Sequence, residues 1–436
     1  LKCRVEVPFG ELKVNRAVKD AIITSEGQLT PNYEYIADLR RQKERRVAAH
    51  KVGFRGVPQK TVLVLGAGFV AGPVVDHFEK DASVDVSIAS AVPDELDRFS
   101  SILDSSRRHV IDVDKDLPHL ENLIDANDMV ISLLPYPLHP MVARICIDKG
   151  RHMLTTSYLS QELAGLHEEA RKAGVTVINE CGLDPGIDHM LAMECVDRIR
   201  EHGGKVTSFV SYCGGLPAPE HSDNPLRYKF SWSPRAVLLA MNNPAKYQLK
   251  GKIVQINGDG GVLDDIQPID FMPGFNLIGY PNRDSTVYGE AYGIQPHTLL
   301  RGTLRYKGFV EAARALKRFG LLSSQPDPHL DHSTGPDLTW KQYTALLLNK
   351  KQDIFPDSLR NIAADWFGPD KRREFQAIES LGLLSDELMV EKLDTPLDTL
   401  AAHLAKQLRY EKGERDMVLL NHDVEAQLPH GNLVRA

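Results

Sequence analysis

The segment from Gly66 to Gly72 has the residue spacing of a loop that binds a dinucleotide. It reads GAGFVAG, with Gly66 and Gly68 separated by one residue and Ala71 three positions further on. In such loops the first glycine permits a tight turn, the second lets the backbone approach a pyrophosphate, and a small third residue allows close helix–strand contact. Amide groups at the start of the next helix favour the phosphate charge. We therefore predict a dinucleotide site, against the alternative of a glycine turn without a ligand.

Two other strand ends near this loop predict further cofactor contacts. The strand VDVSIA ends at Ala89-Ser90-Ala91, where dinucleotide folds often hold an acid for ribose hydroxyls or an arginine for a ribose phosphate. Neither is present, and the lack of an arginine favours NAD without excluding NADP. Leu134 and Pro135 end the strand DMVISLLP and are predicted to border the nicotinamide-side ribose. An ordinary strand exit is an equal alternative for these two residues.

Asp184 and Tyr158 are polar residues that can meet the ionic groups of a substrate. They belong to the segments GLDPG and TTSY, each of which follows a predicted parallel strand, so both are expected on the cofactor side of the sheet. Pro185 keeps Asp184 out of the α region. The Asp184 carboxylate can bind or orient an amine, and capping of the helix that follows is an equal alternative. Tyr158 can donate to a carboxylate or be an ordinary surface residue.

Two arginines and a cysteine lie in other polar segments. Arg283 in YPNRDS and Arg305 in RGTLRY can make bidentate contacts with substrate carboxylates. For a single arginine taken alone, a solvated or ion-paired role is the favoured interpretation. Cys213 lies in SYCGGLPAPE, where no adjacent base is visible, so packing against a ligand is favoured over a nucleophilic role.

Short apolar strands alternate with amphipathic helices between Lys60 and Ile178. Strands are predicted at TVLVLG, VDVSIA, HVIDV, DMVISLLP, HMLTTS and VTVIN, with helices at 69–79, 139–149 and 161–172. This alternation predicts a Rossmann-type, doubly wound parallel sheet of the α/β class. After a helix at 187–200, longer strands with polar turns predict an α+β substrate domain that contains a helical insertion.

The same pattern predicts four parts of the chain. They are a linker from an upstream domain at 1–57, a dinucleotide-binding domain at 58–180, a substrate-binding domain formed by 181–308 and 411–436, and a helical insertion at 309–410.

Composition excludes several other classes of protein. A net charge of −7 over 436 residues gives no general attraction to nucleic acid or to an anionic membrane surface. No apolar run approaches the roughly 20 residues that a membrane-spanning helix needs. The five cysteines form no CxxC pair and the 16 histidines form no HExxH motif, so we predict no disulfide framework and no metal.

Taken together, the motifs resemble the saccharopine dehydrogenase family. That family has, in the same order, GAGFVAGP, VISLLPY, TTSY, GLDPGIDHMLAME, SYCGGLPAPE, NPLRYKFSWSP, PGFNLIGYPNRDS and RGTLRYKGF, which here span about residues 58–425. The resemblance implies an oxidoreductase of lysine degradation that acts on a CH–NH bond. Saccharopine, NAD and water would give glutamate, aminoadipate semialdehyde and NADH. A dehydrogenase for another opine and a non-catalytic dinucleotide-binding relative are the alternatives.

The resemblance also implies which residues contact the two ligands. Asp184 and His189 are the candidates for proton transfer, which needs a group with a pKa near the working pH. The implied substrate contacts are Tyr158, Asp184, Cys213, Arg283, Thr303, Leu304 and Arg305, with Ser231 and Trp232 added from FSWSP. The implied cofactor contacts are Gly66, Gly68, Phe69, Val70, Ala89, Leu134, Pro135, Thr156, Ser157, Tyr158, Asp184 and Pro185.

Both ends of the chain carry further expectations. Residues 1–57 resemble the connection from the lysine-ketoglutarate reductase domain of bifunctional animal enzymes. This implies that domain as a partner, a homo-oligomer and a mitochondrial matrix location, with a cytoplasmic location as the alternative. Family members continue beyond the segment that ends this chain, LPHGNLVRA. We therefore expect a missing partner strand, an unpaired sheet edge and impaired activity.

Overall fold

The computed structural model describes residues 22–23, 29–30, 60–350, 355–429 and 431–435. The chain forms two compact units, which are Leu1–Glu194 with Val434–Ala436, and Cys195–Leu433. The predicted linker at 1–57 lies outside the described residues, except for the antiparallel strands β1 (Ile22–Ile23) and β2 (Leu29–Thr30). The finer domain boundaries given above stay predictions.

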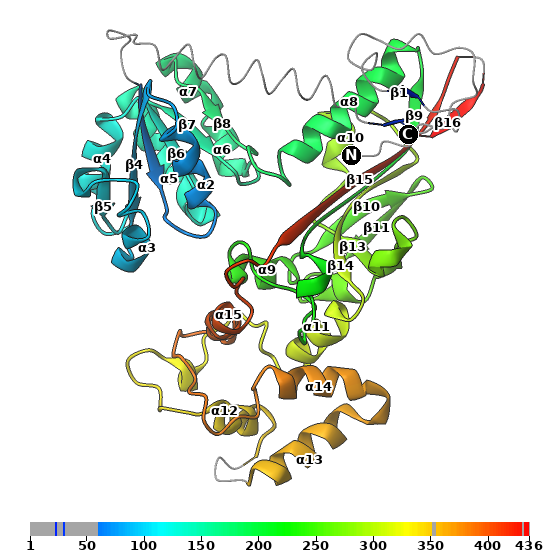
Figure 1. Ribbon diagram of the computed structural model, residues 1–436. Helices are drawn as coiled ribbons and strands as arrows, with labels where there is room; N and C mark the ends of the chain where they lie inside the picture. Colours follow the sequence, from blue (N-terminus) through cyan, green and yellow to red (C-terminus); the bar gives the residue numbers. More distant parts are fainter. Residues whose placement is uncertain (1–21, 24–28, 31–59, 351–354, 430, 436) are drawn as a thin grey trace. The chain divides into compact units, whose positions relative to one another are not determined.

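The first unit is built on a six-stranded, fully parallel sheet (Figure 1). Its strand order is β5-β4-β3-β6-β7-β8, which is the Rossmann order when β3 is counted as the first strand. The expected fold class is therefore confirmed. The strands are β3 (Lys60–Leu65), β4 (Val84–Ser90), β5 (Arg108–Val110), β6 (Met129–Ser132), β7 (His152–Thr155) and β8 (Val177–Ile178).

Helices cover both faces of this sheet, which explains why its strands are continuous apolar runs. Val62 and Val64 of β3 pack in one cluster with Val75 of α2. Leu63 and Leu65 pack in another cluster with residues of α4 and α5. The helices of the unit are α2 (Ala71–Phe78), α3 (Pro93–Asp97), α4 (Leu117–Asp125), α5 (His139–Lys149), α6 (Gln161–Gly165) and α7 (His167–Ala173), with 3-10 turns at Ser105–Arg107 and Tyr136–Leu138.

Helix α8 (Ile187–Glu201) follows the first sheet, and the boundary between the two units falls inside it. Its bounds agree with the helix predicted at 187–200. The helix predicted at 161–172 is instead interrupted at Leu166, between α6 and α7. Leu166 is the residue that ends α6 and precedes α7, and its side chain is buried in the core under the sheet.

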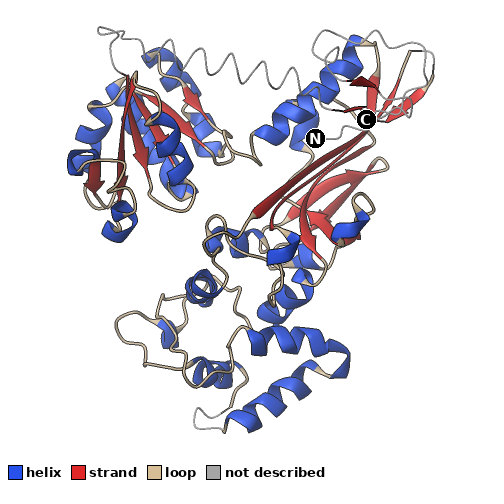
Figure 2. Cartoon of the chain, viewed as in Figure 1, coloured by secondary structure: helices blue, strands red, loops and turns tan. Residues whose placement is uncertain are grey.

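Most strands of a mixed sheet of eight strands belong to the second unit (Figure 2). The path is β11-β10-β14-β9-β15-β16, and β13 with its partner β12 branches from β14. The pair β14–β9 is parallel, whereas β15–β9 and β13–β14 are antiparallel. The strands are β9 (Lys205–Pro217), β10 (Ala245–Leu249), β11 (Lys252–Ile256), β12 (Gln267–Pro268), β13 (Leu277–Pro281), β14 (Thr298–Tyr306), β15 (Asp416–Gln427) and β16 (Leu433–Arg435).

A mostly helical stretch separates β14 from β15, and a large apolar cluster joins its helices to α9. The helices of the unit are α9 (Pro234–Ala240), α10 (Val287–Ala291), α11 (Phe309–Arg318), α12 (Trp340–Leu347), α13 (Pro356–Phe367), α14 (Arg372–Ser380) and α15 (Pro396–Gln407). The 3-10 turns are Pro219–His221, Gly261–Leu263, Pro273–Phe275, Pro328–Leu330 and Pro369–Lys371. Among the described helices, none is long and apolar enough to cross a bilayer.

Candidate active site

The glycine loop joins β3 to α2, and the space beside Gly68 at the start of the helix is open. Gly66 has φ +100°, and a Cβ there would lie 3.0 Å from the carbonyl oxygen of Leu133, so only glycine fits without strain. A Cβ on Gly68 would meet nothing within 4 Å. No side chain caps α2, so its first amide groups remain available to an anion. These features fit a dinucleotide, whose pyrophosphate Gly66, Gly68 and the start of α2 would hold.

The other predicted cofactor residues of this unit differ in exposure. Phe69 and Val70 are exposed beside the loop. Ala89 is buried in the core, and its carbonyl oxygen accepts from the amide of Gly66 at 2.8 Å. Leu134 packs against the same core, partly buried. Any contact of Ala89 with a cofactor would therefore involve its backbone.

The segments TTSY and GLDPG lie against each other in the first unit. The Tyr158 hydroxyl donates to Oδ1 of Asp184 at 2.8 Å. A Cβ on Gly182 would lie 3.1 Å from the carbonyl oxygen of Pro185 and 3.4 Å from that of Thr156. The structure thus brings Thr156 and Tyr158 together with Asp184 and Pro185. Tyr158 and Asp184 are 26 positions apart in the sequence.

His189 lies beside two carboxylates. Its Nε2 is 2.8 Å from Oε2 of Glu180, and its Nδ1 is 3.8 Å from Oδ2 of Asp188. The other Glu180 oxygen accepts from the amide of Leu159 at 2.9 Å, directly after Tyr158. Because Glu180 links His189 to the TTSY segment, it is a candidate site residue that the sequence reasoning missed.

A second missed residue, His139, lies buried under the same strand ends. Its Nδ1 is 2.9 Å from Oγ of Ser132, at the end of β6. Its Nε2 is 2.9 Å from Oγ of Ser157 and 3.0 Å from Oγ1 of Thr155, at the end of β7. Burial lowers the pKa of His139 to about 4, so the ring is neutral at neutral pH. It therefore cross-links two strand ends through hydroxyl groups, one of which belongs to a predicted cofactor contact.

In the second unit, adjacent strands place several predicted substrate residues together. Cys213 of β9 is opposite Thr303 of β14 in the parallel ladder. Cys213 is buried, and Leu304 is fully buried in an apolar cluster. A Cβ on Gly214 would lie 2.7 Å from Cβ of Leu304, which shows how closely the two strands pack. Leu304 could meet a substrate only through its backbone.

Arg305 is a buried cation held between aromatic rings. Arg305 is only 7% exposed, and its Cζ lies 4.8 Å from the centroid of the Tyr228 ring and 5.1 Å from that of the Phe309 ring. Its Nη1 donates to the carbonyl oxygen of Leu304 at 2.8 Å, while Nε has no hydrogen-bond partner among the described residues. No ion pair joins Arg305 to a carboxylate within that part of the chain. A buried charge without a counterion is costly unless it binds an anion.

Arg283 lies away from Arg305 along the same ladder. Ile278 of β13 is opposite Arg305, whereas Asn282 donates its amide to the carbonyl oxygen of Arg301. Arg283 follows the end of β13 at Pro281, beyond the residue opposite Arg301. Arg283 is exposed, with φ +54°. The two arginines therefore stand at different positions along the ladder, where each could meet a carboxylate of an elongated substrate.

Ser231 and Trp232 precede helix α9. Trp232 is 42% exposed, and the neighbouring Phe230 is buried, with its amide donating to the carbonyl oxygen of Leu408. Ser233 caps α9 by accepting from the amide of Ala236. In the described residues no hydrogen bond, ion pair or ring contact joins Ser231 or Trp232 to Arg305, so their predicted role rests on the resemblance alone.

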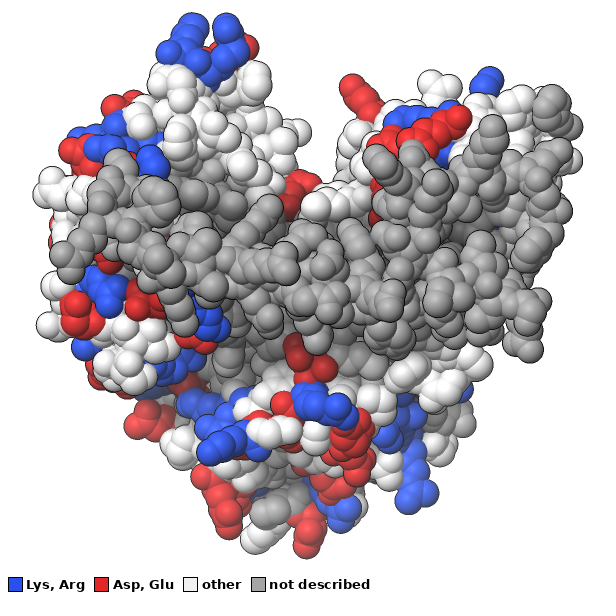
Figure 3. Space-filling model, turned by 45° about the horizontal axis from the view of Figure 1, so that its top comes forward, with Lys and Arg blue, Asp and Glu red and all other residues white. Residues whose placement is uncertain are grey.

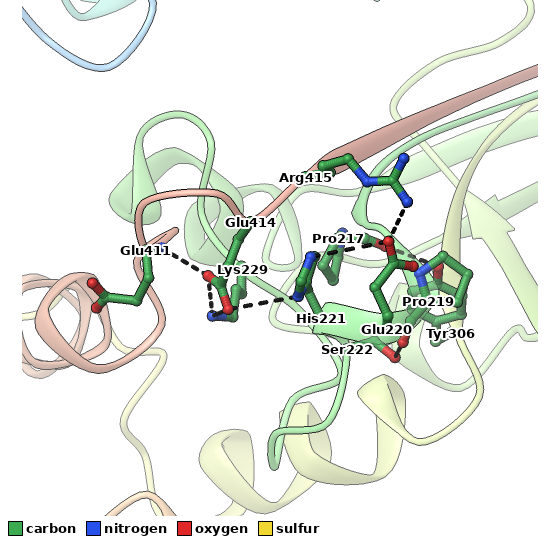
Figure 4. Close-up of polar contacts among 10 residues, drawn as sticks. All are labelled: Pro217, Pro219, Glu220, His221, Ser222, Lys229, Tyr306, Glu411, Glu414 and Arg415. Carbon is green, nitrogen blue, oxygen red and sulfur yellow. Dashed lines mark hydrogen bonds and ion pairs between the residues drawn. The ribbon is translucent and has the colours of Figure 1, made fainter.

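A network of charges fixes the end of β9 (Figure 4). Nζ of Lys229 lies 2.6 Å from Oε1 of Glu414, and Arg415 pairs with Glu220. Hydrogen bonds from the Glu411 amide and Lys229 lower the pKa of Glu414. The hydroxyl of Tyr306 donates to the carbonyl oxygen of Pro217 at 2.8 Å. These contacts tie the SYCGGLPAPE segment to the chain before β15.

Other parts of the described surface offer less. Figure 3 shows side chains of both signs interspersed on the face it draws, with no basic stripe there. Asp331, His332 and Asp394 lie within metal-binding distance of one another. However, Asp331 accepts from Ser333 and Thr334, His332 bonds to Asp394, and all three lie near the surface, so this group carries no metal assignment.

The strand order of the first unit and its open glycine loop define a dinucleotide-binding oxidoreductase fold. Family models match both halves of the chain. The "Saccharopine dehydrogenase NADP binding domain" matches residues 62–178, and the "Saccharopine dehydrogenase C-terminal domain" matches residues 182–435. The chain belongs to the saccharopine dehydrogenase family, which confirms the resemblance inferred from its motifs.

Individual relatives agree with this assignment. The mitochondrial alpha-aminoadipic semialdehyde synthase of Rattus norvegicus is 42% identical over 428 residues, which are 98% of this chain but 45% of that protein. The chain thus spans about half the length of such relatives. A Schizosaccharomyces pombe protein named saccharopine dehydrogenase [NADP(+), L-glutamate-forming] is 39% identical over 85% of this chain and 82% of its own. The solved apo saccharopine dehydrogenase (L-Glu forming) of Saccharomyces cerevisiae has 39% identity and a TM-score of 0.71, covering 86% of this chain and 83% of that one.

Proposed function

We propose that this chain oxidises saccharopine, with NAD and water, to glutamate and aminoadipate semialdehyde in lysine degradation. Its family membership and its open glycine loop support the reaction class. The observation that carries the choice of an anionic substrate is Arg305, a buried guanidinium stacked on Tyr228 and Phe309 without a carboxylate partner among the described residues. Saccharopine has three carboxylates, and an arginine prepared in this way binds one of them strongly.

The bound nicotinamide cofactor would supply the hydride acceptor, and the glycine loop with the start of α2 would hold it. We propose NAD because the exit of β4, at Ala89, Ser90 and Ala91, has no arginine for a ribose phosphate. Some relatives are named as NADP(+)-dependent enzymes, so the choice between NAD and NADP is a testable part of the proposal.

Substrate binding is assigned to side chains of the second unit. Arg305 would hold one carboxylate, and Arg283, which follows the end of β13, would hold another. Cys213 of β9 and Thr303 of β14 are neighbours on adjacent strands and would line the space beside the bound substrate. Ser231, Trp232 and the backbone of Leu304 complete the proposed substrate contacts.

Proton transfer is assigned to groups of the first unit. The secondary amine of saccharopine must lose its proton before the neighbouring carbon, which becomes the aldehyde carbon, gives up a hydride. The imine that results takes up water and breaks into the aldehyde and the amine of glutamate. Asp184, oriented by the Tyr158 hydroxyl, would accept the amine proton. His189, held by Glu180, would serve the water addition.

The setting of the protein is proposed from its relatives. The mammalian relatives are named as mitochondrial enzymes, which supports a mitochondrial matrix location, with the cytoplasm as the alternative. Because the chain spans about half of these relatives, we propose an upstream lysine-ketoglutarate reductase domain as its partner in a longer polypeptide. A homo-oligomer is proposed on the resemblance alone.

The proposal is tested by following reduced cofactor in the presence of saccharopine, with this chain and with the longest gene product that contains it. We expect Arg305→Gln to raise KM for saccharopine by about ten- to a hundred-fold, because a charge-assisted contact is lost. Dissociation constants for NADH should not change. Arg409→Gln is the matched control, since Arg409 is an exposed arginine of the same unit paired with Glu411.

Two results would contradict the proposal. One is a folded, NADH-binding protein that oxidises no saccharopine in either form, particularly if another opine is turned over. The other is an unchanged KM in Arg305→Gln, which would remove the buried guanidinium from substrate binding.

A further inference from the structure

The strand end that normally recognises the adenosine ribose has no ionisable side chain here. In dinucleotide folds an acid at the end of the second strand binds the ribose hydroxyls, or an arginine binds a ribose phosphate. In this chain that strand is β4, and its end reads Ala89-Ser90-Ala91. Ala89 is buried in the core, so its side chain cannot reach a ligand. Recognition of the ribose must therefore come from somewhere else.

A carboxylate from the next helix lies at this strand end. Glu95, in the first turn of α3, accepts a hydrogen bond from Oγ of Ser90 through Oε2 at 2.8 Å. Ser90 is only 8% exposed, and its Oγ accepts from the amide of Val92 at 3.2 Å, which fixes the serine hydroxyl. A carboxylate has about four acceptor positions, and this bond uses one. Glu95 itself is half-buried, so it keeps access to solvent.

The other end of α3 is fixed to the glycine loop. Nη2 of Arg98 donates to the carbonyl oxygens of Ala67 and Gly68, the second at 3.1 Å. Both carbonyls belong to the loop that would hold the pyrophosphate. Arg98 therefore keeps α3, and with it Glu95, beside the loop and the end of β4. The serine contact and the arginine contact are independent, and both hold α3 at the place where the adenosine ribose is expected.

We propose that Glu95 replaces the missing strand-end acid and accepts hydrogen bonds from the 2′- and 3′-hydroxyls of the adenosine ribose. A fixed carboxylate favours two neighbouring hydroxyls and repels a 2′-phosphate, so the site selects NAD over NADP. The inference deepens the proposed function, on whose dinucleotide site it rests. Under this proposal Glu95 of α3, rather than a residue at the end of β4, determines the choice of cofactor. The preference for NAD would distinguish this chain from relatives named for NADP(+).

The competing assignment gives the ribose to Arg98. A guanidinium beside the glycine loop could bind a 2′-phosphate. In this structure, however, Nη2 is already bonded to two loop carbonyls, and Nε points to the carbonyl oxygen of Glu95 at 3.4 Å. Binding a phosphate would require Arg98 to leave these acceptors. The anchored carboxylate needs no rearrangement, and the geometry favours it.

The test measures dissociation constants for NADH and NADPH by cofactor fluorescence, with the full chain and without substrate. Wild type should bind NADH more tightly than NADPH. Glu95→Gln should weaken NADH about ten-fold or more and bring the two constants together, because an ionic acceptor and a repulsive charge are both lost. Ser90→Ala, which frees the carboxylate from its anchor, should give a smaller change in the same direction. Asp94→Asn is the matched control, as an exposed acid of the same helical turn that should leave both constants unchanged.

The outcomes decide between the two side chains. The inference is overturned if Glu95→Gln has the same ratio of NADH to NADPH dissociation constants as wild type while circular dichroism shows an intact fold. It is also overturned by a wild-type preference for NADPH that Arg98→Gln removes. The failure of this inference can be distinguished from the failure of the proposed reaction. If NADH binding depends on Glu95 but the protein oxidises no saccharopine, the ribose assignment is supported and only the proposed substrate is refuted. If saccharopine is turned over and Glu95→Gln leaves the cofactor ratio unchanged, only the ribose assignment is refuted.

Discussion

The buried histidine between the strand ends of the first unit makes stability depend on pH in a predictable way. The pKa of His139 falls from 6.5 to about 4 on folding, because burial disfavours the imidazolium. The unfolded chain therefore takes up the proton first as the pH falls, so stability is fully present above about pH 6.5 and is lost as the pH falls towards 4. The ring is 1% exposed, so solvent screens this effect little. The difference of about 2.5 pKa units corresponds to about 3 kcal/mol.

The variant His139→Gln isolates this contribution. A glutamine amide can still bond to the hydroxyls of Thr155 and Ser157, but it does not take up a proton in this range. We expect its stability at neutral pH to be lower than that of wild type, because the bond to Ser132 is lost. Between roughly pH 7 and pH 4.5, wild type should lose about 2 to 3 kcal/mol more than the variant, or roughly 10 °C in Tm.

Calorimetry over a pH series is the appropriate measurement. The transition of the first unit is identified as the one that moves to higher temperature when NADH is added. His167→Gln is the control, because His167 is an exposed histidine of the same unit and its replacement should leave the pH dependence as in wild type. Parallel pH profiles for wild type and His139→Gln would show that His139 does not stay neutral in the folded protein, and the reasoning from burial would fail.

Three further predictions concern the site itself. Gly66→Ala should weaken NADH binding at least about ten-fold, since its Cβ would press on the carbonyl of Leu133 at a φ that L residues avoid; an unchanged fluorescence titration would contradict this. Tyr158→Phe removes the hydroxyl bonded to Asp184 and should lower kcat about ten-fold while NADH binding stays constant. Treatment with a chelator should leave turnover and Tm unchanged, and a loss that added Zn²⁺ restores would refute the expectation that no metal takes part.

The sequence alone determined the local features of this protein. The apolar run of β3 and the glycines after it specify a strand, a tight turn and a helix from residues that are neighbours in the chain. The alternation of apolar strands and helices likewise predicted the parallel sheet, because burial on both faces requires such runs. The helix predicted at 187–200 also agrees with α8, because its apolar spacing is a local property.

Only the tertiary structure decided which distant side chains meet. Nothing in the local pattern shows that Arg98 reaches the carbonyl oxygens of Ala67 and Gly68, that His139 joins β6 to β7, or that Arg305 is stacked between Tyr228 and Phe309. These contacts depend on strand order and register, and on helices that pack against particular faces of a sheet. The physical reason is that periodicity and turn chemistry are set by near neighbours, whereas a hydrogen bond or a ring contact requires the whole chain to bring two side chains within a few ångströms.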